Sequence, residues 1–269
     1  MHNEVAFPLH AARGAAYLTA PNIAARHAFS TRLGGVSTGV LESLNLSVRR
    51  GDTPENVREN WRRLGAAAGL DLTRAVYARQ IHSADVRIAH AADAQPPERE
   101  PRFACDGFVT NEPGVPLAVF MADCLPVLLH DPAAGVIGAV HCGWRSSVAD
   151  ILGVTVEKMC ALGAEPGSIC AAMGASIGRC CFETDDDVPE ALRAALGHEA
   201  EPYMVWNGSK WHIDLKVVNG LWLQKAGVTA IDICGDCTAC RPDLYWSHRK
   251  TGLQRGEQAA LIALKEDTP

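Results

Sequence analysis

Two reactive residues stand at the ends of two apolar runs in "MADCLPVLLHDPAAGVIGAVHCGWRS", from Met121 to Ser146. Cys124 precedes "PVLLH" and His141 ends "VIGAVH", and the segment between them predicts a hairpin turn at residues 131–135. Facing residues then have numbers that sum to about 266, so Cys124 and His141 lie opposite each other or one step apart. Opposed Cβ atoms are about 5 Å apart, which suits a thiol–imidazole pair or two ligands of one metal.

A third candidate ligand is His82 in "RQIHSADV", which follows a short predicted strand. His82, Cys124 and His141 would form a His/Cys/His set, and three protein ligands with one open position are typical of a catalytic zinc site. The alternative is a buried thiol beside a hydrogen-bonded imidazole, and the residue types leave both interpretations open.

Further cysteines occur in "CGDCTAC", where Cys234, Cys237 and Cys240 give two overlapping C-x-x-C spacings. This spacing is found in structural zinc sites and in redox centres. Only three thiols are present there, with His248 as the nearest further ligand, so we interpret them as free or packed thiols. We interpret the adjacent Cys180 and Cys181 as packing residues too.

The elements that must position these residues alternate irregularly along the chain. Residues 1–24 are expected to be an irregular lead-in, and residues 25–269 one large domain. Thr53 is the expected N-cap of a helix with Pro54 at its first position. Strands are expected at "ARHAFST", "DGFVT", "LAVFMAD", "PVLLH", "VIGAVH", "SICAAMG", "VTAIDICG" and "AALIAL", and helices at "TPENVRENWRRLGAAAGL", "SVADILGVTVEKMCALGA", "DVPEALRAALG" and "DLKVVNGLWLQKAG". Strand clusters interrupted by single helices favour an α+β fold with mixed sheets.

Composition narrows the class of partner. The 269 residues carry a formal net charge of −6 and no basic stripe, so neither nucleic acid nor an anionic membrane is an expected partner. No stretch reaches the roughly 18 apolar residues of a membrane span, and the first residues lack a signal-peptide pattern. We therefore expect a cytoplasmic protein with reduced thiols that acts on a small molecule; its oligomeric state is not encoded in any pattern we recognise.

Several motifs in chain order resemble those of one family: "FSTRLGGVSTG", "SLNLS", "QIHSADV", "ADCLPVLLHD", "HCGWRS", "GASIGRCCFE", "KWHIDL" and "CTACRPDLYWSHRKTGLQRGEQAALI". The chain resembles, from about residue 25 to 265, the multicopper polyphenol oxidase (laccase-domain) family, also called purine nucleoside phosphorylase-like or peptidoglycan editing factor. The resemblance implies that residues 25–269 are a laccase-domain-like catalytic domain, built as a single layered α/β sandwich with mixed sheets, similar to the toxin-type cysteine deamidase fold. It also implies a zinc site on His82, Cys124 and His141. Two positions depart from the family pattern. Cys142 stands where the family usually has a small Ala, and Ser146 stands where it often has a Gly.

The resemblance further implies phosphorolysis of adenosine, inosine, guanosine and methylthioadenosine, with deamination of adenosine. Phosphorolysis requires an anion-binding group near the nucleoside. Arg32, in the Gly-rich turn "TRLGGVSTG", and Arg145, just before a predicted helix, are the candidates for binding phosphate. The alternative for each is a surface ion pair.

The metal is expected to be Zn²⁺. No two of the 10 histidines are two residues apart, so the His-x-His pairs of multicopper oxidases are missing. Copper remains an alternative for the His/Cys/His set, since both metals accept these ligands.

Two other classes of function stay open at this point. The first is an amide hydrolase of peptidoglycan precursors, the family's editing role, with Cys124 as nucleophile and His141 as base. The second is a non-catalytic metal-binding module, which binds zinc without turnover.

Overall fold

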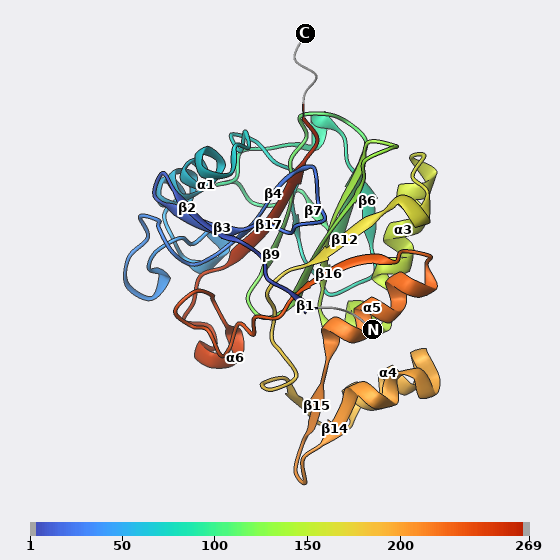
Figure 1. Cartoon of the computed structure of the whole chain (residues 1–269). Helices are drawn as coiled ribbons and strands as arrows, with labels where there is room; N and C mark the ends of the chain where they lie inside the picture. The colour runs from blue at the N-terminus through green and yellow to red at the C-terminus, as the bar shows by residue number, and fades with distance from the viewer. Residues whose placement is uncertain (1–3, 266–269) are drawn as a thin grey trace.

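Two large β-sheets pack face to face in the computed structural model, which describes residues 4–265. Helices cover the outer faces of both sheets, with α1 on one side and α3 and α5 on the other (Figure 1). The result is a four-layer α/β/β/α arrangement. This confirms the expected mixed α/β class with several sheets, while the likeness to toxin-type deamidases stays a prediction.

The larger sheet has seven strands and mixes parallel with antiparallel pairs. In spatial order they are β1 (Glu4–Val5), β16 (Ala230–Cys234), β12 (Cys170–Met173), β10 (Leu125–Asp131), β11 (Val136–Cys142), β8 (Gly107–Thr110) and β6 (Val86–Ile88). The predicted hairpin β10–β11 therefore lies near the middle of this sheet.

The second sheet has five strands and is antiparallel throughout. Its spatial order is β2 (Leu9–Ala12), β3 (Ala15–Leu18), β4 (Arg26–Ser30), β17 (Gln258–Ala263) and β9 (Leu117–Met121). Two small sheets complete the set: β13 (Glu183–Thr184), β15 (Trp211–Ile213) and β14 (Met204–Trp206), and β5 (Ala78–Arg79) with β7 (Phe103–Ala104).

Six α-helices occur in the described residues. They are α1 (Pro54–Ala68), α2 (Trp144–Val148), α3 (Ile151–Ala161), α4 (Asp187–Leu196), α5 (Leu215–Lys225) and α6 (His248–Thr251). None of these helices has the length and apolar character needed to cross a membrane.

The core follows the alternation of side chains along the central strands. In β10, Leu128 faces the five-stranded sheet, whereas Val127 and Leu129 face the layer of α3 and α5. In β17, Ala260 and Ile262 face the seven-stranded sheet in the same way. Because both faces of β10 and β11 are covered, every residue of these two strands is buried. The hairpin that carries the reactive residues is thus held rigidly.

Helix signals in the sequence are mostly confirmed. Thr53 caps α1 by accepting a hydrogen bond from the Asn56 N–H, with Pro54 at the start of the helix. The single helix predicted after Ser146 is wrong, because α2 and α3 are separate. Asp150 lies between them with φ of 53° and caps α3 through the Gly153 N–H.

The prediction of an irregular segment over residues 1–24 is also wrong for the part that the structure describes. This segment contains β1, which pairs in parallel with β16, and the hairpin β2–β3, which joins the five-stranded sheet. Strand β1 has only two residues and β2 is exposed, so neither has the apolar pattern of a strand, whereas β3 is buried and apolar but only four residues long.

Candidate metal centre

The register of the central hairpin determines how Cys124 and His141 relate. Pro126 pairs with His141, so facing residues sum to 267 and not to 266. Cys124 therefore lies two positions from the residue opposite His141, and not directly opposite or one step away as the sequence predicted. Cys124 is in the bend just before β10, and this bend brings its sulfur within 4.8 Å of a ring nitrogen of His141.

His82 is brought to this place by a tight loop between β5 and β6. Its own φ is 60°, a left-handed conformation that is uncommon outside glycine. The backbone N–H groups of Ile81, His82 and Ser83 all donate to the carboxylate of Asp106, at 3.1, 3.0 and 2.8 Å. These three hydrogen bonds hold the loop in its unusual conformation.

The same Asp106 carboxylate accepts a hydrogen bond from His141 Nδ1 at 2.9 Å. Asp106 is only 1% exposed, so this bond is shielded from water. The bond fixes the proton on Nδ1 and leaves Nε2 of His141 free as a donor atom toward Cys124. Sequence analysis missed Asp106, because the only signal was an acidic residue directly before the predicted strand "DGFVT".

The three expected ligands form a compact donor set. The ligand atoms of His82, Cys124 and His141 all lie within 4.8 Å of one another. Cys124 Sγ is 3.8 Å from His82 Nε2, close to the about 3.5 Å that separates sulfur and nitrogen ligands around tetrahedral zinc. His141 is buried and His82 exposed, so the set opens to solvent on one side. These residues fit a metal with three protein ligands and an open position.

Electrostatics in the centre favours a thiolate. Burial alone would raise the pKa of Cys124, but the charges and hydrogen bonds of His141 and His82 outweigh it and lower this pKa to about 6. For His141, burial alone would lower the pKa, but the Cys124 thiolate and Asp106 raise it to about 9. Deprotonated cysteine is the form that binds metals and attacks electrophiles, so the site is prepared for either role.

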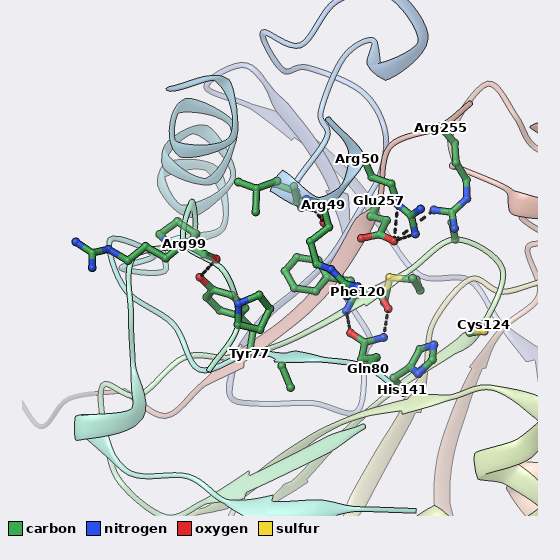
Figure 2. Close-up of a pocket in the computed structure, with 18 of the residues that line it drawn as sticks. Arg49, Arg50, Tyr77, Gln80, Arg99, Phe120, Cys124, His141, Arg255 and Glu257 are labelled. Atoms are coloured by element: carbon green, nitrogen blue, oxygen red, sulfur yellow. Dashed lines mark hydrogen bonds and ion pairs between the residues drawn. The ribbon is translucent and has the colours of Figure 1, made fainter. Parts of the chain in front are cut away.

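Two adjoining cavities meet at the centre, of about 230 and 390 Å³. Figure 2 shows the first, with Cys124 and His141 near one end, Tyr77 toward the other, and Arg50 and Arg255 turned toward Glu257. The shared lining comprises Arg50, His82, Ala122, Cys124 and Arg255. Together the cavities fall within the range of small-molecule sites, roughly 300–1,000 Å³.

The two predicted phosphate-binding arginines have different places. Arg145 lines the second cavity beside the centre, and its guanidinium lies over the Trp144 ring at 4.1 Å. Arg32 is absent from both cavity linings. Its guanidinium donates to the carbonyl oxygens of Glu42 and Pro242 and stacks on Trp246. Arg32 thus holds the Gly-rich turn in place and does not line the cavity that Arg145 lines.

Both departures from the family pattern have structural explanations. Cys142 pairs with Leu125 in the hairpin and packs in the apolar layer against α3, away from the three donors. It fills space there, and burial raises its pKa well above the ordinary range. Ser146 Oγ accepts a hydrogen bond from the Gly143 N–H at 3.0 Å and so caps the start of α2.

Comparisons with known proteins bear on the identity of this centre. The model of the family described as "Multi-copper polyphenol oxidoreductase laccase" matches residues 26–265. A purine nucleoside phosphorylase of Deinococcus radiodurans is 41% identical over 255 residues, 94% of each chain. The adenosine deaminase RL5 of an unknown prokaryotic organism is 36% identical over 85% of this chain and 90% of its own.

A solved structure has the same fold. The crystal structure of YlmD from Geobacillus stearothermophilus matches with a TM-score of 0.89 and 34% sequence identity. The match covers 97% of this chain and 99% of that one, so the layers described above are common to both proteins.

The hydrogen bonds that the Asp106 carboxylate accepts predict what Asp106→Asn would do. The amide keeps the volume but removes the charge and one acceptor, so two or more N–H groups lose their partner. We expect zinc affinity, measured by chelator competition, to fall about 10- to 100-fold. The free energy of unfolding should fall by about 1–3 kcal/mol. Asp85→Asn, in the same loop but exposed, is the matched control and should change neither quantity. Wild-type affinity in Asp106→Asn would show that Asp106 does not support the centre.

Gly143 offers a steric test of His82. A Cβ at this position would lie 2.6 Å from His82 Cδ2 and 3.5 Å from Cys124 Sγ. Its φ of −76° suits alanine, so Gly143→Ala should fold normally while displacing the imidazole. We expect zinc affinity to fall by about tenfold or more. Gly167→Ala, where a Cβ meets no atom within 4 Å, should bind zinc as the wild type does. Wild-type affinity in Gly143→Ala would contradict the expected displacement of the His82 imidazole from the metal.

Proposed function

The chain belongs to the multi-copper polyphenol oxidoreductase laccase family, and on that premise we propose that it is a zinc-dependent purine nucleoside phosphorylase. Adenosine, inosine, guanosine and methylthioadenosine are the proposed substrates, with deamination of adenosine as a side activity. The observation that carries the proposal is an open His/Cys/His centre shared by two cavities, one with Tyr77 and Phe120 in its wall and the other with Arg145. Relatives named as phosphorylases and as a deaminase support the substrate class.

The first cavity is suited to a purine nucleoside. Tyr77 and Phe120 meet edge to face with ring centroids 5.9 Å apart, and both line this cavity. Tyr77 is anchored from behind, because its hydroxyl donates to the carbonyl oxygens of Pro96 and Arg99. Fixed aromatic and apolar walls bind a flat base at little entropic cost.

The second cavity is suited to phosphate. Its lining includes the four arginines Arg50, Arg145, Arg249 and Arg255. The first cavity also has four arginines and shares two of them, so Arg145 and Arg249 are the ones that belong to the second cavity alone. Arg255 is 7% exposed and, among the described residues, its Nε has no hydrogen-bond partner. Glu257 neutralises part of this charge through Arg50 and Arg255, while Arg145 has no acidic partner in the described chain. Guanidinium groups with unused N–H donors are strong phosphate receptors.

Phosphorolysis joins an oxygen of phosphate to C1′ of the ribose and breaks the C1′–N bond. The purine leaves with the proton that phosphate gives up, so the reaction balances without an added acid. Arg145 and Arg255 would hold phosphate near C1′, and Asp106 would keep the His141 proton on Nδ1. When bound by His82, Cys124 and His141, zinc would supply a Lewis acid at the open position.

A second candidate function rests on the chain Cys124–His141–Asp106. A thiol with a lowered pKa, an imidazole beside it and a carboxylate that orients the imidazole are the parts of a cysteine hydrolase. This supports the alternative of an amide hydrolase of peptidoglycan precursors. The two candidates differ in the reactivity of Cys124: a zinc-bound thiol resists alkylation, whereas a free catalytic thiolate reacts first among the ten cysteines.

The first experiment measures base release from inosine with and without phosphate. We expect hypoxanthine and ribose 1-phosphate in equal amounts, formed only with phosphate. His82→Ala, which removes an exposed ligand without disturbing the core, should lose both the zinc ion of this centre and the activity. Zinc-loaded protein that releases no base from any of the proposed nucleosides would reject the phosphorylase and favour amide hydrolysis.

Arg145→Ala tests the phosphate subsite. The side chain is exposed, so the variant should fold. Loss of one charged contact predicts a KM for phosphate raised about tenfold or more, with a much smaller change in the KM for inosine. Arg62→Ala, on the exposed face of α1 and paired with Glu59, is the control and should leave both values unchanged. An equal rise in both values would remove Arg145 from the phosphate site.

A further inference from the structure

Four cysteines gather on the side of the molecule where β12 and β16 end. Cys180 and Cys181 follow β12, whereas Cys237 and Cys240 follow β16. All four sulfur atoms lie within 4.8 Å of one another. Cys181 packs against an apolar cluster, as expected of a packing residue, but the sequence did not show that Cys180 and Cys181 meet the thiols of Cys237 and Cys240. Neither Cys234 nor His248, the partners considered from the sequence, belongs to this group of sulfur atoms.

The topology explains this meeting. Strands β12 and β16 are parallel neighbours, so the loops that follow them leave the same edge of the sheet. A further parallel bridge between Ser176 and Cys237 holds the two loops together beyond the strands. The Thr238 N–H donates to the Ser176 carbonyl at 3.0 Å and extends this pairing. The backbone thus brings the two pairs of thiols together.

The sulfur positions match those around a metal with four thiolate ligands. Cys240 Sγ lies 3.6 Å from Cys180 Sγ and 3.4 Å from Cys181 Sγ. Zinc–sulfur bonds of about 2.3 Å in a tetrahedron place sulfur atoms about 3.8 Å apart, within a few tenths of an ångström of these distances. All four cysteines are free thiols, and two of them are exposed, so a metal ion has access.

The surroundings also support sulfur as a ligand. The Gly178 N–H donates to Cys237 Sγ at 3.1 Å, a contact that stabilises a negatively charged sulfur. A Cβ on Gly178 would lie 3.2 Å from Cys237 Cβ and 3.3 Å from Cys180 Sγ, so glycine suits this close approach. In the C-x-x-C turn, the N–H groups of Cys240 and Arg241 both donate to the Cys237 carbonyl.

Packing alone gives these loops little support. Their apolar cluster contains only Ile177, Cys237 and Ala239 as buried members, with Cys181 and Phe182 against them. Small clusters of this kind stabilise weakly, and a metal cross-link between two loops supplies what the core does not. A closed set of four thiolates is typical of structural zinc.

We propose that Cys180, Cys181, Cys237 and Cys240 bind a second zinc ion, with a structural role. The four thiols lose their protons when the ion binds, and the ion joins the loop after β12 to the loop after β16. This site is separate from the His82, Cys124 and His141 centre and shares no ligand with it.

Hydrogen bonds connect the four-cysteine site to the wall of the second cavity. The Arg249 guanidinium donates to the carbonyl oxygens of Cys181 and Glu183, at 2.8 and 3.0 Å. The Asp123 carboxylate, next to Cys124, accepts hydrogen bonds from Thr238 Oγ1 and from the Arg249 N–H, both at 2.6 Å. Zinc on the four thiols would therefore fix the arginine-lined wall of the second cavity.

The test counts zinc ions in the full-length chain, loaded with zinc under reducing conditions and then freed of weakly bound metal. We expect Cys240→Ser to hold one equivalent fewer than its parent, by mass spectrometry under native conditions and by elemental analysis. Cys160→Ser, a half-buried cysteine on α3 outside the cluster, should keep the parental count. The same difference should appear in the His82→Ala background, so the outcome does not depend on the first centre.

Two further measurements keep the proposal falsifiable if Cys240→Ser folds poorly. Cys240→His retains a zinc ligand and should keep the parental count. Cobalt(II) added to His82→Ala protein should give the intense sulfur-to-metal charge-transfer absorption of a thiolate site, and the Cys180→Ser change should abolish most of it. An unchanged zinc count in Cys240→Ser, or cobalt binding without that absorption, would overturn the proposal.

Discussion

The buried carboxylate of Asp106 accepts hydrogen bonds from three consecutive N–H groups of the His82 loop and from the imidazole of His141. A single negative charge thereby joins a loop with strained backbone to the central hairpin. Without a carboxylate there, the buried Nδ1–H of His141 would lose its partner, at a cost of about 1–3 kcal/mol, and the loop would lose the acceptor that its N–H groups share. The relative positions of the two histidines therefore depend on one residue that touches neither cavity.

Around this interaction, buried strands hold the reactive residues, and loops at the surface form the walls of the cavities. Strands β10 and β11 are buried on both faces and fix the positions of Cys124 and His141. The walls of the cavities come instead from loops and strand ends far apart in the sequence, such as Arg50, Tyr77 and Arg255. A rigid reactive centre with walls of varied origin suits a family whose members carry different activity names.

The sequence predicted those parts that depend on local chemistry. The hairpin, the Thr53 cap and the three donors follow from apolar patterns, turn residues and helix signals. Other parts depend on strand order, which no local pattern contains. The thiols after β12 meet those after β16 only because these strands are parallel neighbours. Asp106 looks like any acidic residue before a strand until its buried position is known.

Arg32 shows that a local pattern can leave the role of a side chain open. An arginine in a Gly-rich turn is typical of an anion site, yet nearby carbonyl oxygens and a tryptophan ring occupy its guanidinium. Only the tertiary structure shows which of two chemically sound uses an arginine has. The same ambiguity explains why Arg255 was not recognised, since its burial beside both cavities leaves no trace in the residues next to it.

The position of β17 has a consequence for synthesis on the ribosome. This strand, the last in the described chain, lies between β4 and β9 and is an interior strand of the five-stranded sheet. Until it emerges, β4 and β9 each present an open edge with unpaired backbone groups, which invites association with other chains. Arg255 and Glu257, which line the first cavity, emerge just before it. The fold therefore closes late, and a chain interrupted before β17 would present as an aggregation-prone target for chaperones and proteases and not as a partly active enzyme.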